Sequence, residues 1–252
     1  MDIHIITLFP GMFSGPFGES IIKRAQEKGL VNIHLHNLRD FGLGKRKSTD
    51  DYPYGGGPGM VMRVEPIYWA VEKIKGEIDS KGAKGKTILL TPQGEIFTHD
   101  KAKELAREPI LIFINGHYKG IDERIRIHLI EEELSIGDYI LSGGELATMV
   151  VVDAIVRLIL GVVGDEESLK GDSFYQDLLE GPLYTRPMNF QGMKVPDILV
   201  SGDHRKIRMW RKKEALRRTY LRRPELLKKI DLSEEDKRLL EEVKKEQQGV
   251  HR

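Results

Sequence analysis

Four glycine-bearing segments in the first two-thirds of the chain are the residues best suited to chemistry. They are PYGGGPGMVM at 53–62, TPQGE at 91–95, NGHYKGIDER at 115–124 and SIGDYILSGGE at 135–145. Each of the last three follows a candidate strand and precedes a candidate helix. In an open α/β sheet, ligands bind where such loops leave the carboxyl ends of the strands. We therefore expect these three loops to form one binding site, with the first loop nearby.

The loops suit an adenine nucleoside. Glycines let backbone N–H and C=O groups approach a ligand closely, and main-chain amides can read the edge of adenine. Ile136, Tyr139, Ile140 and Leu141 would supply apolar walls for a flat ring. The alternative is a set of tight turns packed against a buried sheet, and three such loops in series favour the binding site.

Two charged residues beyond the loops are candidates for catalysis. Asp172, in the segment GDSF, is isolated from other carboxylates and follows a glycine, so it could act as a general base. A solvated loop residue or a helix cap is the alternative. Arg157 lies within the otherwise apolar stretch 150–160, where a charge needs a partner or a ligand. An ion pair with Asp153 is the alternative for Arg157.

The charge distribution predicts a polyanion partner for the C-terminal part. The net charge is only +1, but residues 131–180 contain 12 acidic and 2 basic side chains, whereas 203–229 contain 12 basic and 3 acidic ones. The basic run RKIRMWRKKEALRRTYLRRPELLKK interleaves Trp210 and Tyr220 with arginines. Cations and aromatic rings together suit phosphates and unstacked bases, which favours RNA or DNA binding over a solvated helix face.

Alternating strands and helices position these residues. The apolar pattern predicts strands at 3–9, 31–36, 87–90, 110–114 and near 139–141, helices at 19–28, 66–75, 100–107, 122–130 and 145–160, and a polar loop at 40–59. Short apolar strands that alternate with helices indicate an α/β fold with a parallel sheet and helices on both faces.

Residues 1–163 are therefore expected to form one domain. The acidic, glycine-punctuated segment 164–174 is typical of a flexible linker or lid. A small, mostly helical domain is expected at 175–252, with helices at 205–221, 224–229 and 233–247. Ser233 followed by two glutamates favours the start of the last helix.

Several function classes are disfavoured. The chain has no cysteine, which argues against disulfides and thiolate chemistry and favours a reducing cytoplasm. It shows no apolar run of the roughly 18 residues that a membrane span needs, and no leader-like N-terminus. LSGGE at 141–145 lacks an accompanying P-loop, and Gly55–Gly59 cannot complete a dinucleotide fingerprint. The histidines lack metal-ligand spacing, so no metal site is expected.

The assembled motifs identify the chain as similar to the bacterial tRNA (guanine-N1)-methyltransferases, which belong to the knotted SPOUT methyltransferases. The resemblance runs nearly end to end. It rests on TLFPGMF at 7–13, DDYPYGGGPGMVM at 50–62, TPQGEIF at 91–97, GIDER at 120–124, SIGDYILSGGE at 135–145, DSF at 172–174, YTRP at 184–187 and VPDILVSGDH at 195–204.

The resemblance implies methylation of N1 of guanosine 37 in tRNA with S-adenosylmethionine. It also implies a deep trefoil knot near residues 90–145, an obligate homodimer whose active sites span both subunits, cytoplasmic location and assistance by magnesium. Asp172 would be the general base, and Arg157 would steady the guanine as charge develops towards O6. The implied cofactor residues are Pro92, Gln93, Gly94, Gly116, Tyr118, Gly120, Ser135, Ile136, Gly137, Asp138, Tyr139, Ile140, Leu141, Gly143 and Gly144. The expected tRNA-binding residues are Arg186, His204, Arg205, Arg208, Trp210 and Arg211.

Three positions depart from the family pattern CGRYEG. Asn115, His117 and Lys119 stand where Cys, Arg and Glu are usual, and Lys119 reverses a charge near the expected site. Leu160 also replaces a usual proline after the long helix. Two other functions stay open: an RNA-binding protein that uses the cofactor without catalysis, and a methyltransferase that acts on ribosomal RNA.

Overall fold

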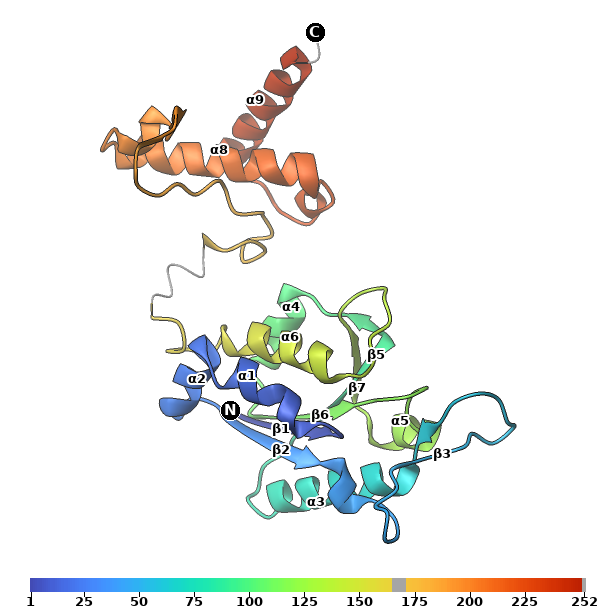
Figure 1. Ribbon diagram of the computed structural model, residues 1–252. Helices are drawn as coiled ribbons and strands as arrows, with labels where there is room; N and C mark the ends of the chain where they lie inside the picture. Colours follow the sequence, from blue (N-terminus) through green and yellow to red (C-terminus); the bar gives the residue numbers. More distant parts are fainter. Residues whose placement is uncertain (165–170, 251–252) are drawn as a thin grey trace. The chain divides into compact units, whose positions relative to one another are not determined.

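The computed structural model describes residues 1–164 and 171–250 of the chain. The chain divides into two compact units, Met1–Gly164 and Asp165–Arg252, called here the N-terminal and the C-terminal unit (Figure 1). Each unit is described by itself.

A five-stranded sheet forms the centre of the N-terminal unit. Its strands lie in the order β2 (Asn32–Asn37), β1 (Asp2–Thr7), β6 (Ile110–Asn115), β5 (Lys86–Ile96) and β7 (Glu132–Ser135). All neighbouring strands are parallel. Every residue of β6 is buried, as expected for a central parallel strand. The predicted parallel sheet is confirmed.

Helices cover both faces of the sheet, as predicted (Figure 1). On one face, α1 (Ser14–Phe17), α2 (Ser20–Glu27), α4 (His99–Leu105) and α6 (Glu145–Val156) pack over Ile5 and Phe113. On the other, α3 (Val64–Asp79) and α5 (Glu123–Leu129) pack over Ile6 and Ile112. Side chains alternate between the faces along a strand, so β1 and β6 each supply both cores.

Shorter elements connect these strands and helices. Two 3₁₀ turns, η1 (Pro10–Phe13) and η2 (Leu38–Phe41), follow β1 and β2. The short antiparallel strands β3 (Asp50–Asp51) and β4 (Val61–Met62) flank the loop that contains Gly55–Gly59. Within the long polar loop predicted at 40–59, η2 overlaps the start and β3 lies near the middle.

The last strand of the sheet is not where the sequence pattern placed it. A strand near 139–141 was expected, but β7 is Glu132–Ser135 and Tyr139–Leu141 lie in the loop that follows. β7 begins with two adjacent glutamates, which do not fit the apolar pattern used to predict strands. Glu132 forms ion pairs with Lys86 (2.9 Å) and Lys101 (2.7 Å), and Glu133 forms one with Arg126. Lys86 and Lys101 come from distant segments, so local sequence does not reveal that they neutralise Glu132, whereas Arg126 comes from the helix just before the strand.

Three further boundaries differ from the prediction. β5 continues through TPQGE to Ile96, with a register shift between Leu90 and Glu95, so TPQG is an irregular stretch inside the strand. The helix predicted at 145–160 ends at Val156. The helix predicted at 224–229 is the 3₁₀ turn η4 (Leu226–Lys228).

The C-terminal unit contains a short hairpin and two long helices. β8 (Asn189–Phe190) pairs with β9 (Met193–Lys194), and η3 (Asp197–Val200) leads to α8 (His204–Arg222) and α9 (Glu234–Val250). Ser233 and Asp236 exchange side-chain to backbone hydrogen bonds of 3.2 and 3.3 Å, so the predicted cap at Ser233 is confirmed. No helix within residues 1–164 and 171–250 is both long and apolar enough to cross a membrane.

Candidate functional site

A cavity of about 520 Å³ lies at the carboxyl ends of β5, β6 and β7. Because parallel strands end at the same edge, the three glycine loops converge there, as the sequence predicted. Thirteen of the fifteen expected cofactor residues line the cavity: Pro92, Gln93, Gly116, Tyr118, Gly120, Ser135, Ile136, Gly137, Tyr139, Ile140, Leu141, Gly143 and Gly144. The volume is in the range typical of small-ligand sites.

Two expected residues do not line the cavity. A Cβ atom on Gly94 would lie 2.5 Å from the backbone of both Glu133 and Leu134, so glycine is required there for the close approach of β5 to β7. Asp138 is exposed on the loop after β7 and lies outside the cavity lining. Gly94 therefore allows the close packing of β5 against β7, and its role at the cofactor stays a prediction.

The loop after β7 is held by its own hydrogen bonds. The Gly137 N–H donates to Ser135 Oγ at 3.2 Å, and Tyr139 Oη donates to the Ile136 carbonyl at 3.2 Å. Gly137 has φ +148°, which a side chain would strain. Tyr139 and Ile140 remain 53% and 81% exposed, so they present open apolar surface at the cavity. Their role as walls for a flat ring stays a prediction.

Sequence reasoning missed part of the charged wall of the cavity, because it expected only Lys119 near the site. Glu123 and Arg126 of α5 and Lys119 of the middle loop all line it. The motif GIDER was the available signal, because Asp122 accepts from the Arg124 N–H at 2.9 Å and so caps α5 beside the loop. Arg126 also contacts the side chain of Gln93, which orients that residue of the first loop.

Two of the three departures from the family pattern, His117 and Lys119, line this cavity, and Asn115 directly precedes Gly116 of the lining. Asn115 is buried, donates to the Ile6 carbonyl at 3.1 Å and accepts from the Thr148 hydroxyl. His117 lies beside Glu145, with 3.5 Å between Nε2 and Oε2. The aliphatic stem of Lys119 packs against Gly59. Lys119 forms no ion pair with a residue that the structure describes, so it adds an uncompensated positive charge to the cavity.

The two candidate catalytic residues belong to different units. Arg157 is half-buried in the turn that ends α6, and its backbone N–H donates to the Asp153 carbonyl at 3.2 Å. Asp172 is half-buried in the C-terminal unit, where it lines a cavity of about 460 Å³ with Arg211 and Lys212. Of the expected lid at 164–174, residues 165–170 lie outside the described residues.

The basic helix α8 carries five of the six expected tRNA-binding residues. His204, Arg205, Arg208 and Arg211 are exposed, whereas Trp210 is half-buried with its ring centroid 6.4 Å from that of Tyr184. His204, Arg208 and Arg211 follow helical spacing and share one face. In the C-terminal half of the helix, by contrast, Lys213 and Arg217 form ion pairs with Glu242 and Glu246 of α9.

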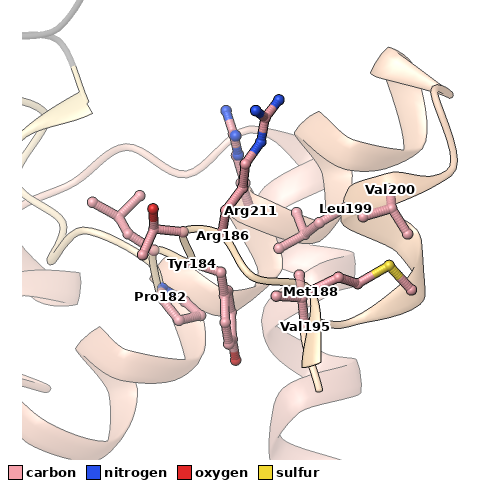
Figure 2. Close-up of a pocket in the computed structure, with 10 residues that line it drawn as sticks. Pro182, Tyr184, Arg186, Met188, Val195, Leu199, Val200 and Arg211 are labelled. Atoms are coloured by element: carbon pink, nitrogen blue, oxygen red, sulfur yellow. The ribbon is translucent and has the colours of Figure 1, made fainter. Parts of the chain in front are cut away.

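Arg186, the sixth expected residue, lies at another cavity in the C-terminal unit. This cavity of about 510 Å³ is lined by Arg186, Arg211, Tyr184 and several aliphatic side chains. Figure 2 shows the side chains of Arg186 and Arg211 extending in the same direction, with Met188, Val195 and Leu199 beside them. Neither arginine forms an ion pair within the described parts of the chain. The cavity thus combines cationic and apolar groups.

Metal binding finds no support in the residues that the structure describes. Across residues 1–164 and 171–250, no group of three or more His, Asp or Glu side chains is placed to hold a metal ion.

The chain thus combines an α/β unit, which has a cavity at the carboxyl edge of its parallel sheet, with a helical unit that carries the basic helix α8. The family model described as "tRNA (Guanine-1)-methyltransferase TrmD" matches residues 1–229. The chain belongs to this family of enzymes. It is 57% identical over 247 residues to the tRNA (guanine-N(1)-)-methyltransferase of Bacillus cereus strain G9842, covering 98% of this chain and all of the relative. The protein of the same name from Anoxybacillus flavithermus is 55% identical over 245 residues, covering 97% and 99% of the two chains.

Proposed function

We propose that the chain transfers the methyl group of S-adenosylmethionine to N1 of the guanine at position 37 of tRNA, beside the anticodon. Family membership supports tRNA guanine-N1 methylation. The structural observation that carries the proposal is the convergence of three glycine loops on one cavity at the carboxyl edge of the sheet.

The cavity fits the cofactor in size and in the chemistry of its lining. Main-chain groups of Gly116, Tyr118 and Gly120 and of the loop after β7 would read the adenine edge and the ribose, and Ile136, Ile140 and Leu141 would enclose the ring. S-adenosylmethionine supplies an activated sulfonium methyl group. The protein must then align the guanine with this methyl group and accept the proton that leaves guanine N1.

Asp172 is proposed as the general base. Guanine N1 carries a proton at neutral pH and is a poor nucleophile, so its proton must leave as the new N–C bond forms. A carboxylate that accepts this proton supplies the missing reactivity. Arg157 is proposed to stabilise the negative charge that develops towards guanine O6. Both roles rest on the family resemblance, and the structure describes the two residues in separate units.

The C-terminal unit is proposed as the tRNA-binding part. Arg205, Arg208 and Arg211 are exposed and form no ion pair with a described residue, so they are available for phosphates. Arg186, Arg211 and Tyr184 surround a cavity that is partly apolar and partly cationic (Figure 2), which suits an unstacked base beside its phosphate. The N1 edge of guanine is a Watson–Crick edge, so position 37 must be splayed out of its loop to react.

The remaining parts of the proposal concern organisation. We propose a cofactor-binding domain at 1–163, a linker or lid at 164–174 and a tRNA-binding domain at 175–252, acting in the cytoplasm as a homodimer whose active sites span both subunits. We also propose the trefoil knot of the SPOUT class. In its support, the loop after β7 returns across the end of β6, where the Gly144 N–H donates to the Gly116 carbonyl at 2.9 Å.

The proposed reaction is tested with paired tRNA transcripts that carry either G or A at position 37. Labelled methyl transfer from S-adenosylmethionine is measured, and the modified base is mapped. Methylation of only the G transcript, at N1 of that base, is expected. Cofactor binding without transfer to either transcript would instead support a non-catalytic RNA-binding protein. Transfer to a ribosomal RNA fragment alone would support a methyltransferase that acts on ribosomal RNA.

A further inference from the structure

Glu145 is a buried carboxylate next to the proposed cofactor cavity. It is the first residue of α6, and its side chain is only 2% exposed. A buried carboxylate is costly unless charges or hydrogen bonds compensate it. The N-terminus of α6 favours a negative charge, and the Thr7 hydroxyl at the end of β1 donates to Glu145 Oε1 at 2.8 Å.

His117 faces the other carboxylate oxygen. Its Nε2 atom lies 3.5 Å from Glu145 Oε2, an ion-pair distance that is longer than a good hydrogen bond. The imidazole is 17% exposed and packs against Phe9, with 5.0 Å between ring centroids. Thr7, Glu145 and His117 therefore form a polar chain that joins the end of β1, the start of α6 and the loop after β6.

This polar chain ties together two walls of the cavity. His117 forms an isolated antiparallel bridge with Gly143, and its backbone N–H donates to Met62 Sδ at 3.0 Å. Both the His117 loop and the Gly143 loop line the cavity. A movement of His117 would consequently displace the two loops that are proposed to read the cofactor.

Gly143 leaves room for the contact between His117 and Glu145. A Cβ atom there would lie 2.3 Å from His117 Cδ2 and 2.4 Å from Glu145 Oε2, so the imidazole or the carboxylate would have to move. Gly143 does not have a positive φ, so space and not backbone conformation requires glycine. The second glycine of the SGGE segment has the same role towards Asn115, with 2.9 Å from its Cβ position to Asn115 Cα.

We propose that His117 is a positioning residue for the methyl donor: paired with buried Glu145, it fixes the middle and last glycine loops in the arrangement that binds S-adenosylmethionine. The inference rests on the proposed function, because it concerns the cofactor of that reaction. It assigns a role to a position where the family usually has arginine. Histidine and arginine can both donate a hydrogen bond to Glu145.

The test is cofactor binding by the full-length chain, measured by calorimetry with S-adenosylmethionine, together with kcat at saturating cofactor and the melting temperature. His117→Ala should raise the Kd about tenfold, the effect expected for one lost contact to a charged group, while kcat stays within about twofold. His117→Arg should restore binding. His128→Ala, which removes an exposed histidine from α5, is the matched control and should bind as the wild type does.

A double-mutant cycle separates positioning from general damage. Gly143→Ala should displace the imidazole and weaken binding, and adding His117→Ala should cost less than the sum of the two single effects. If His117→Ala melts below the assay temperature, Glu145→Gln carries the test, because it keeps the shape and removes the charge that faces His117.

Unchanged Kd in His117→Ala, or additive effects in the cycle, would overturn the inference. A lower melting temperature with an unchanged Kd would show a merely structural role and would overturn it as well. A wild-type chain that binds no S-adenosylmethionine would instead refute the proposed function, so the two failures are distinguishable.

Discussion

Three stacked histidines at one side of the sheet predict a specific loss of stability in acid. His4 on β1 lies between His34 and His36 of β2, with ring centroids 4.6 and 5.2 Å away, and His4 Nδ1 shares a 3.0 Å hydrogen bond with His36 Nε2. Burial, followed by the neighbouring charges of His34 and His36, lowers the pKa of His4 from 6.5 to about 4.

The other charges around the cluster have mixed effects. Asp2 opposes the shift at His4, and Lys81 adds to it. From α3, Glu77 raises and Lys73 lowers the pKa of His36, which is lowered overall, chiefly by burial. His34 pairs with Asp2 at 3.1 Å. The nearby carboxylates do not reverse the lowering of the His4 pKa, so His4 is neutral at pH 7 in the folded state.

The sign and size of the effect follow from linkage. Because the folded pKa of His4 is lowered, the unfolded state binds a proton first, and stability falls as the pH drops from about 6.5 towards 4. With pKa values of 6.5 and about 4, the loss attributable to His4 between pH 7 and pH 5 is about 2 kcal/mol. For a unit of this size, that corresponds to about 4–8 °C in melting temperature.

The assay is calorimetric melting of the wild type and of His4→Val at pH 7 and pH 5. Valine suits a buried strand position and cannot titrate. The melting temperature of His4→Val should fall by about 4–8 °C less than that of the wild type over this interval. His128→Ala removes an exposed histidine and should keep the wild-type dependence. Equal acid sensitivity in His4→Val and the wild type would refute the reasoning.

Three further predictions follow from the sites. Asp172→Asn should keep cofactor affinity and lose about 10²–10⁴ in turnover, measured in single-turnover methyl transfer, and full activity would remove Asp172 from the mechanism. Gly94→Ala should destabilise the chain by about 1–3 kcal/mol in urea unfolding, because its Cβ would meet the backbone of Glu133 and Leu134 at 2.5 Å, and an unchanged midpoint would contradict that packing. Arg208→Ala and Arg211→Ala should each weaken tRNA binding and lower its salt slope by about one per lost phosphate contact, whereas Lys213→Ala, at a residue paired with α9, should change the slope little.

Much of the N-terminal unit was predictable because its signals are local. Apolar runs such as Ile110–Asn115 and glycines at strand ends indicate a parallel sheet with loops at one edge. Glu132 and Glu133 interrupt the apolar pattern of β7, and the two lysines that neutralise Glu132, Lys86 and Lys101, come from elsewhere in the fold. Local sequence gives no information about such distant partners.

The role of individual glycines also escaped the sequence. Gly94 and Gly143 were expected at the ligand. In the structure, their lack of a side chain allows close contacts within the protein. Likewise, the burial of Glu145 beside His117 arises only when three distant segments meet. The roles of Asp172 and Arg157, the knot and the dimer stay predictions.

The most direct test of the central claim is to locate the methyl donor on the chain. The full-length protein is irradiated with methyl-labelled S-adenosylmethionine, with and without excess S-adenosylhomocysteine, and the labelled peptides are mapped. Label confined to the loops at 91–93, 116–121 and 134–144, and removed by the competitor, is the predicted result. Competitor-sensitive label at the cavity of Tyr184 and Arg186, or no competitor-sensitive label at all, would contradict the claim that this sheet edge holds the cofactor.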